Sequence, residues 1–200
     1  MMRQVALAAV NVLQPHLTRA FSSQMPEFTI DITDHLTSPL VEHAFLKCVI
    51  HRVLVEEQVD IATISLALVS DCEIHRLNRQ FLGHDYPTDV ISFLLDESPE
   101  MASAADFDSG HRASGDSPMS DSLKSSVKIN GELIVSTDTA IREASAHGWS
   151  PDAELLLYLV HGLLHLCGYD DLTDEARPVM RSRERELLAI WGFCPTGLEP

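Results

Sequence analysis

The 200-residue chain is short of positive charge: 14 lysines and arginines stand against 30 aspartates and glutamates, a formal net charge of −16. Nucleic-acid binders usually carry a basic patch, because neutralising phosphates supplies most of their non-specific affinity. The charge therefore argues against tight binding of nucleic acid by the whole surface. Much of the acid lies in residues 96–121, which hold seven acidic side chains and one basic side chain. The rest of the chain thus leaves room for a local cationic surface.

Long apolar runs and paired cysteines are also missing. No segment offers the roughly twenty consecutive apolar residues that a membrane helix needs, which excludes a membrane span. The four cysteines lie far apart and lack the paired spacing of a cysteine zinc site. Reduced thiols are the simplest interpretation of such cysteines, and they predict a cytoplasmic protein.

Two histidines four residues apart carry the main functional signal. On a helix, His161 and His165 project from the same face, so both imidazoles can reach one ion. Gly168 falls where this helix would end, because glycine accepts the left-handed conformation of a C-terminal cap. The reversed chain can then bring Asp171 back to the same ion. Asp170 either orients a ligand or simply terminates the helix.

Three protein ligands leave one position of a tetrahedral zinc ion open to water, as in catalytic sites, whereas structural sites close with four. His161, His165 and Asp171 therefore predict metal-dependent hydrolysis with one Zn²⁺ per chain. Nickel and cobalt suit the same ligands, so the sequence leaves the metal open. The alternative is a structural role, in which both histidines bond to backbone or carboxylate groups.

The helix lacks the glutamate that follows the first histidine in zinc proteases and acts as their general base. Gly162 occupies that position and has no side chain to take a proton. The pattern therefore disfavours a protease of this type. The base must come from another segment, or from zinc-bound water, whose pKa can fall to about 7. Cys167 is interpreted as a small buried hydrophobe in preference to a thiolate ligand.

Interspersed helices and a few short strands predict one α+β domain with a roughly four-stranded mixed sheet and helices packed on it. Ser70 or Asp71 is expected to cap the second helix and Ser150 the fourth. Arginines alternate with Glu175, Glu184 and Glu186 in the last helix, which indicates an exposed, salt-bridged face. Strands are predicted over residues 28–33, 61–69, 88–95 and 132–136, and helices over 37–55, 72–81, 138–147, 151–166 and 173–191.

The predicted domain covers residues 25–195. Residues 1–24 are expected to form a poorly ordered N-terminal extension. Residues 98–128 are rich in serine and aspartate and have almost no large apolar side chains, so they cannot bury enough surface to offset their ordering entropy. We expect them to form a mobile insertion between the third and fourth strands.

Residues 161–171 resemble the signature of the YbeY family of metal-dependent endoribonucleases: histidine, glycine, any residue, leucine, histidine, leucine, any residue, glycine, tyrosine, aspartate, histidine. Every defined position matches except the last, where Asp171 replaces a histidine. Leu82 stands where family members often carry an arginine, and Arg76 or Arg79 could take its place. The resemblance spans roughly residues 27–190 and includes Leu77–Asn78, Asp85–Phe93, Gly131–Ser136 and Thr139–Ala140, in the family's order.

This resemblance implies the same α+β architecture, with a central metal-binding helix and the sheet as one wall of a cleft. It implies a single-strand-specific endoribonuclease acting in ribosomal RNA maturation and ribosome quality control, with zinc-activated water attacking the scissile phosphate. The partners would be ribosomal RNA and, as further candidates, small-subunit ribosomal proteins, with no membrane involved.

The resemblance also places Thr88, Asp89 and Ser92 in the cleft, although Pro87–Asp89 equally suits a simple turn entering a strand. Asp171 would make the bound water less acidic than three imidazoles would, because a charged ligand donates more electron density to the ion. Two other functions stay open. One is a non-enzymatic ribosome-assembly factor with a structural metal, and the other is a zinc hydrolase of small phosphoesters.

Overall fold

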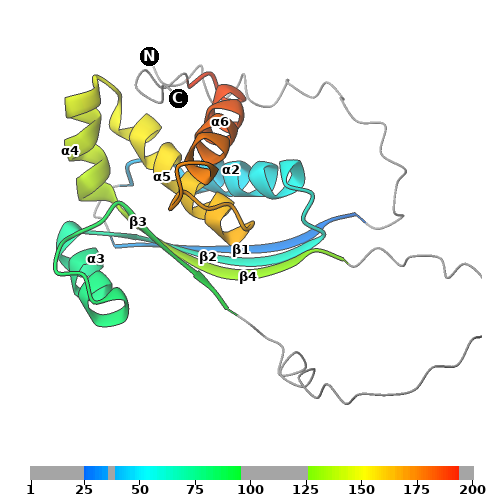
Figure 1. Cartoon of the computed structure of the whole chain (residues 1–200), viewed down its shortest axis with the longest axis horizontal. Helices are drawn as coiled ribbons and strands as arrows, with labels where there is room; N and C mark the ends of the chain where they lie inside the picture. The colour runs from blue at the N-terminus through cyan, green and yellow to red at the C-terminus, as the bar shows by residue number, and fades with distance from the viewer. Residues whose placement is uncertain (1–24, 36–38, 96–125, 194–200) are drawn as a thin grey trace, which may run out of the picture.

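The computed structural model describes residues 25–35, 39–95 and 126–193. The predicted N-terminal extension and nearly all of the predicted insertion lie outside these ranges. Figure 1 shows the arrangement of the described elements. In chain order they are β1 (Glu27–Asp34), α2 (His43–Glu56), β2 (Ile61–Val69), α3 (Asp71–Leu77), the π-helical turn η2 (Asn78–Leu82), β3 (Val90–Leu94), β4 (Lys128–Ser136), α4 (Thr137–His147), α5 (Pro151–Leu166) and α6 (Ala176–Ala189).

The four strands form one mixed sheet in the order β1-β2-β4-β3. β1, β2 and β4 run parallel, and β3 pairs with β4 in the antiparallel sense at one edge. Helices α2, α5 and α6 lie over one face of the sheet, whereas α3 lies on the other (Figure 1). The predicted α+β domain with a four-stranded mixed sheet is therefore confirmed. Within the described ranges, no helix is long and apolar enough to cross a membrane.

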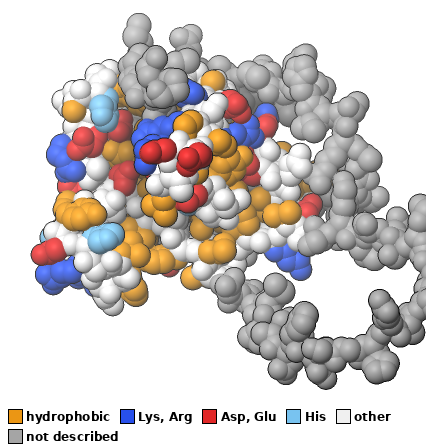
Figure 2. Space-filling view, in the orientation of Figure 1, with side chains coloured by type: hydrophobic (Ala, Val, Ile, Leu, Met, Phe, Trp, Pro, Cys, Tyr) orange, Lys and Arg blue, Asp and Glu red, His pale blue; other side chains and the backbone are white. Residues whose placement is uncertain are grey.

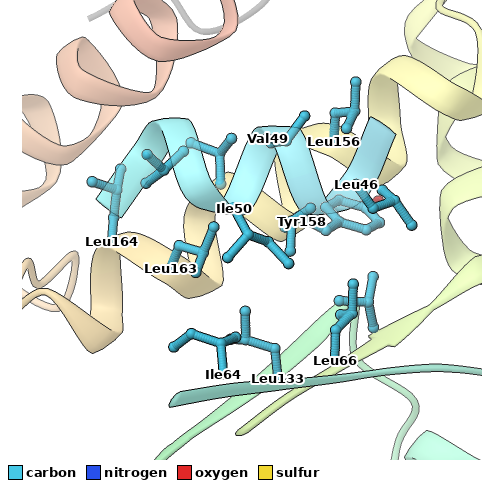
Figure 3. Close-up of a cluster of buried hydrophobic side chains, with 14 of the residues drawn as sticks. Leu46, Val49, Ile50, Ile64, Leu66, Leu133, Leu156, Tyr158, Leu163 and Leu164 are labelled. Carbon is cyan, nitrogen blue, oxygen red and sulfur yellow. The ribbon is translucent and has the colours of Figure 1, made fainter. Parts of the chain in front are cut away.

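Helix α5 occupies the centre of the main hydrophobic core, as predicted. Eleven of its 16 residues are buried, so it contacts neighbours on nearly every side. Apolar side chains of α2 and α5 meet those of β2 and β4 in Figure 3, which labels Leu46, Val49, Ile50, Ile64, Leu66, Leu133, Leu156, Tyr158, Leu163 and Leu164. This packing holds the C-terminal half of α5 against the sheet.

Gly162 lets α5 approach the sheet closely. A Cβ atom at this position would lie 2.8 Å from Cδ2 of Leu133 and 2.9 Å from Cγ2 of Val90. Real Cβ atoms do not come this close to other carbon atoms, so a side chain here would require the buried Leu133 side chain, the Val90 side chain or the helix itself to shift. Gly162, which stands where zinc proteases have their catalytic glutamate, therefore also has a packing role.

The ends of several elements differ from the prediction. Helix α2 begins at His43, not at residue 37, because the backbone at Glu42 is extended with ψ 130°. Strand β4 begins at Lys128, four residues earlier than predicted, and α6 covers only Ala176–Ala189 of the predicted 173–191. Ser150 precedes α5 but makes no side-chain cap hydrogen bond. Such ends depend on local backbone geometry that periodicity does not encode.

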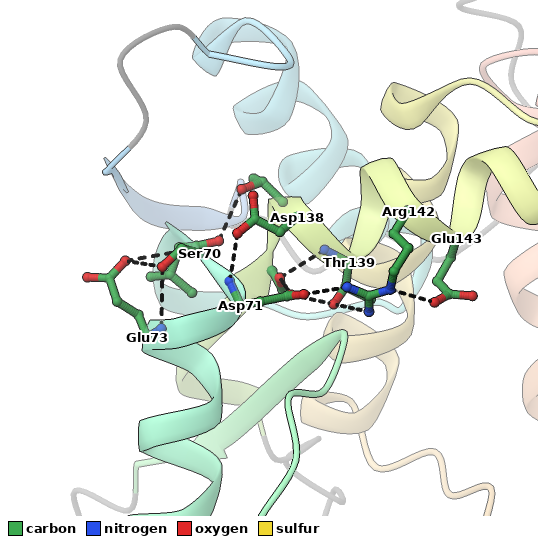
Figure 4. Close-up of polar contacts among 10 residues, drawn as sticks. Ser70, Asp71, Glu73, Asp138, Thr139, Arg142 and Glu143 are labelled. Atoms are coloured by element: carbon green, nitrogen blue, oxygen red, sulfur yellow. Dashed lines mark hydrogen bonds and ion pairs between the residues drawn. The ribbon is translucent and has the colours of Figure 1, made fainter.

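The predicted helix over residues 72–81 is divided into α3 and the turn η2. Ser70 caps α3 through a capping box with Glu73, as predicted for one of the two candidate caps. Asn78 begins η2, is almost fully buried, and donates from Nδ2 to the carbonyl oxygen of Tyr86 at 2.8 Å. The other candidate cap, Asp71, instead bonds across to α4. Its carboxylate accepts hydrogen bonds from Ser136, Thr139 and Arg142. Figure 4 shows Asp71 with Thr139 and Arg142.

Candidate metal centre

The last turns of α5 bring two imidazole rings together. The Nε2 atoms of His161 and His165 lie 3.1 Å apart, and the rings meet edge to face with centroids 4.6 Å apart. Helix α5 ends at Leu166, and Gly168 adopts a left-handed φ of 92°. The amide of Gly168 donates to the carbonyl oxygen of His165 at 3.0 Å. The predicted glycine cap is therefore confirmed.

The chain then reverses and brings Asp171 to both histidines. Its two carboxylate oxygens lie 3.9 Å from Nε2 of His161 and 3.8 Å from Nε2 of His165. Ligand atoms on a tetrahedral zinc ion lie about 3.3–3.6 Å apart, given bonds of about 2.0–2.2 Å. With one ligand atom taken from each residue, the three atoms lie within 4.8 Å of one another, so the two rings and the carboxylate are close enough to converge on one ion after side-chain adjustment. Their exposed fractions are 23%, 28% and 34%, so the group is open to solvent.

The chemistry of the two rings fits a cation. Nδ1 of His161 lies 2.7 Å from Oε1 of Glu184, and Nδ1 of His165 lies 3.0 Å from the carbonyl oxygen of Tyr169. A backbone carbonyl oxygen and an ionised carboxylate both accept, which assigns the proton of each neutral ring to Nδ1. The two Nε2 lone pairs of the neutral rings then lie close together, with the nitrogen atoms 3.1 Å apart. A proton or a metal ion between them removes this repulsion.

Electrostatics at His161 favour positive charge. Burial opposes the charged imidazolium, but the hydrogen bond and charge of Glu184, with the charges of Asp89 and Asp171, outweigh burial and raise the pKa of His161. The same carboxylates would attract a metal cation. The nearby carboxylates therefore favour a cation beside the Nε2 atoms.

Three further residues were predicted to line a cleft. Oδ1 of Asp89 accepts from the Thr88 hydroxyl and from the amide of Val90, both at 2.8 Å, so the turn interpretation holds for this oxygen. The charge of Asp89 nevertheless acts on His161. Ser92 shares its face of β3 with Val90, which lies against α5 at Gly162. All three residues thus lie on or beside the strand that α5 covers, and their role in a cleft stays a prediction.

Other predictions around the site are now resolved. Burial, followed by the charge of Glu57, raises the pKa of the Cys167 thiol to about 12, so without a metal this cysteine is a neutral, partly buried group. Among the described residues, Cys167 does not belong to the group of side chains that can hold a metal ion together. Asp170 is exposed, and its Oδ1 accepts from the amide of Leu172 at 3.1 Å. Asp170 therefore stabilises the turn after α5. The helix already ends at Leu166, so Asp170 does not terminate it as predicted.

The prediction of an exposed, salt-bridged face in the last helix is wrong for Glu184. This residue is 1% exposed, although Glu186 and Arg183 do form an ion pair at 2.7 Å. Residues Met180, Glu184, Leu187 and Leu188 are the buried residues of α6 and recur at helical spacing. A glutamate within this apolar stripe was the signal that could have revealed the partner of His161.

Fold and site together define a class of protein: an α+β domain whose central helix and following turn present two histidines and an aspartate able to hold a metal ion. A family model described as Endoribonuclease YbeY matches residues 29–192. The Endoribonuclease YbeY of Lysinibacillus sphaericus is 34% identical over 167 residues, which cover 82% of this chain and 96% of the relative. The chain belongs to the YbeY endoribonuclease family.

Two further comparisons agree with this membership. The Endoribonuclease YbeY of Rhodopirellula baltica is 37% identical over 139 residues, or 68% of this chain and 58% of the relative. A Thermotoga maritima protein solved in solution superposes with a TM-score of 0.50 and 24% identity, over 82% of this chain and 89% of that one. The solved structure supports the fold, and the sequence relatives support the family.

Proposed function

We propose that this protein is a zinc-dependent endoribonuclease and that His161, His165 and Asp171 hold the ion. The observation that supports the proposal most is the pair of Nε2 atoms 3.1 Å apart. Because each ring uses Nδ1 to donate a hydrogen bond, both lone pairs point into the same space, beside the Asp171 carboxylate. One carboxylate and two imidazoles are suitable ligands for zinc.

Zinc bound there would supply a Lewis acid that activates water and stabilises charge on the scissile phosphate. His161, His165 and Asp171 would hold the ion, and their partial exposure leaves the site accessible to a substrate. Asp171 would be the one charged ligand among the three. Asp89 adds a second negative charge near His161, so positive charge at the centre has two counterions besides Glu184.

The proposed substrate is single-stranded ribosomal RNA, in ribosomal RNA maturation and ribosome quality control in the cytoplasm, with small-subunit ribosomal proteins as candidate partners. Residues 25–195 would form the nuclease domain. Thr88, Asp89 and Ser92 would line the cleft on the β3 side of the ion. The name of the relatives and the metal-binding group support this assignment.

Binding of RNA phosphates depends on scattered basic side chains. On the face seen in Figure 2, the described Lys and Arg side chains lie among acidic ones and do not merge into one patch. Arg79 is exposed and lies 3.8 Å from Asp85, and Arg76 is exposed on the same segment. We propose that Arg76 or Arg79 takes the place of the family arginine at Leu82. We expect weak, salt-sensitive binding with selectivity arising at the metal centre.

The test compares Asp171→Ala with Asp170→Ala as a matched control. Asp170 is the adjacent aspartate and loses only a turn hydrogen bond, worth about 1 kcal/mol. Metal content is measured by mass spectrometry, and cleavage is measured on single-stranded and duplex RNA. We expect about one zinc per chain and single-strand cleavage in wild type and Asp170→Ala, and neither in Asp171→Ala.

Each other result has a definite meaning. Zinc retained by Asp171→Ala would show that the ligand set is wrong. A zinc-loaded wild type that cleaves no RNA would be an assembly factor with a structural metal. Turnover of small phosphoesters without dependence on RNA length would indicate a hydrolase of small substrates.

A further inference from the structure

Glu184 lies buried in α6 directly behind the metal centre. Its side chain is 2% exposed, its Oε1 lies 2.7 Å from Nδ1 of His161, and its Oε2 has no hydrogen-bond partner among the described residues. Most buried polar atoms have a partner, because a desolvated oxygen without one is unfavourable. A buried carboxylate with one hydrogen-bonded oxygen and one unsatisfied oxygen is not expected to stabilise the fold. Its placement against His161 therefore indicates a role at the site.

We infer that Glu184 is a positioning residue. Its carboxylate accepts a hydrogen bond from the Nδ1–H group of His161 and so fixes the tautomer and ring orientation in which Nε2 faces the ion. The inference rests on the proposed function, in which His161 is a ligand. A carboxylate behind a ligating histidine also increases the basicity of the ring, and with it the affinity for the metal. Glu184 itself touches neither the ion nor the substrate.

Helix α6 also supports His165, through a longer chain of hydrogen bonds. Nδ1 of His165 donates to the Tyr169 carbonyl oxygen at 3.0 Å, and the Tyr169 hydroxyl donates to Oε2 of Glu57 at 3.0 Å. Nε of Arg183 donates to Oε1 of the same Glu57 at 2.7 Å. Arg183 and Glu184 are neighbours in α6, so this helix supports both rings. The Nδ1 atom of His161 has a carboxylate as its hydrogen-bond partner, whereas that of His165 has a backbone carbonyl oxygen, which makes Glu184 the more sensitive position.

Glu184→Gln tests this role, with Glu175→Gln as the matched control. Glutamine keeps the size and an acceptor oxygen but removes the charge, and Glu175 is the exposed glutamate that precedes α6. The readout is the dissociation constant for Zn²⁺ and Co²⁺, measured on full-length protein by competition with a chromophoric chelator. We expect Glu184→Gln to weaken binding by about 10–100-fold and Glu175→Gln to leave it unchanged. Circular dichroism and the Tm of the metal-free proteins check that both variants are folded.

Unchanged affinity in folded Glu184→Gln, beside a wild type that binds zinc, would overturn the inference and leave the proposed function intact. A wild type that binds no zinc would overturn both. A second measurement needs no variant: long-range ¹H–¹⁵N spectra of zinc-loaded wild type report the tautomer of each histidine. We expect His161 to carry its proton on Nδ1 and to bind through Nε2. A proton on Nε2 of His161 would overturn the inference even where Glu184→Gln fails to fold.

Discussion

Nδ1 of His165 donates to the backbone carbonyl oxygen of Tyr169, four residues further along the chain, at 3.0 Å. This contact depends on the tight reversal after α5, in which Gly168 adopts a φ of 92°. The orientation of one predicted metal ligand is therefore set by backbone conformation, whereas that of the other is set by the Glu184 side chain. Variants at Gly168 can separate these two effects.

Gly168→Ala should weaken both folding and metal binding. An alanine in the left-handed region is strained by roughly 1–2 kcal/mol, and no atom lies within 4 Å of the added Cβ, so strain is the only new effect. Gly148→Ala is a matched control, since Gly148 also has a positive φ, 71°, and an open surrounding at the end of α4. We expect similar losses of stability in urea unfolding, but reduced zinc affinity in Gly168→Ala alone. Equal zinc affinity in the two variants would contradict the role of the Tyr169 carbonyl group.

Gly162→Ala should destabilise the protein although alanine favours helices. The added Cβ would lie 2.8 Å from Leu133 and 2.9 Å from Val90, and such overpacking destabilises by about 1–3 kcal/mol. Chemical denaturation measures the loss. Leu133→Val removes one methylene group from the crowded side. The double variant with Gly162→Ala should therefore lose less free energy of unfolding than the sum of the losses in the two single variants. Simple additivity would show that the helix moves away from the sheet without strain.

Asp71→Asn should reduce stability near pH 7 and have little effect in acid. Burial disfavours the charged Asp71, but hydrogen bonds from Ser136, Thr139 and Arg142, together with the charge of Arg142, outweigh it and lower the pKa of Asp71 (Figure 4). A lowered carboxylate pKa stabilises the fold above the ordinary aspartate value of about 3.9, and this stabilisation is lost as pH falls through the folded value. Because Arg142 is half exposed, we expect a difference of about 1–2 kcal/mol at pH 7.

Unfolding of wild type and Asp71→Asn from pH 7 down to pH 2 tests this dependence. The gap between the two curves should begin to close below about pH 4 and close further as pH falls through the lowered pKa of folded Asp71. Glu143→Gln serves as the control, because Glu143 bonds only the exposed Arg142 side chain. A constant gap between the Asp71→Asn and wild-type curves would show that the side chain acts through packing and not through its charge.

Asp171→His would give the centre three neutral imidazoles. With no charged ligand donating to zinc, water at the ion should lose its proton more readily, so the rise of RNA cleavage with pH should move to lower pH. The histidine is also longer, and His161 and His165 must accommodate it. Cleavage rates from pH 5 to 9, with zinc content measured at each pH, test the shift. A fully loaded variant with an unshifted profile would show that ligand charge does not control the rate.

Local patterns were sufficient for much of the fold. The alternation in β1 and β2 and the long apolar face of α5 are properties of neighbouring residues, so periodicity located these elements well. The ends were less accurate, as at Glu42 and Lys128, because they depend on backbone turns and strand pairing. The histidine spacing and the position of Gly168 likewise came from sequence alone, since i and i+4 geometry is local to one helix.

Local spacing is enough to show which side chains can meet an ion, because His161, His165 and Asp171 lie within eleven residues and one helix end brings them together. The groups that orient these side chains depend on tertiary packing. Glu184 is 23 residues from His161, and Glu57 is 112 residues from Tyr169. Such contacts arise when α2, α5 and α6 pack on the sheet. Whether a charged side chain is exposed or buried against a ring is then set by packing, which no local spacing encodes.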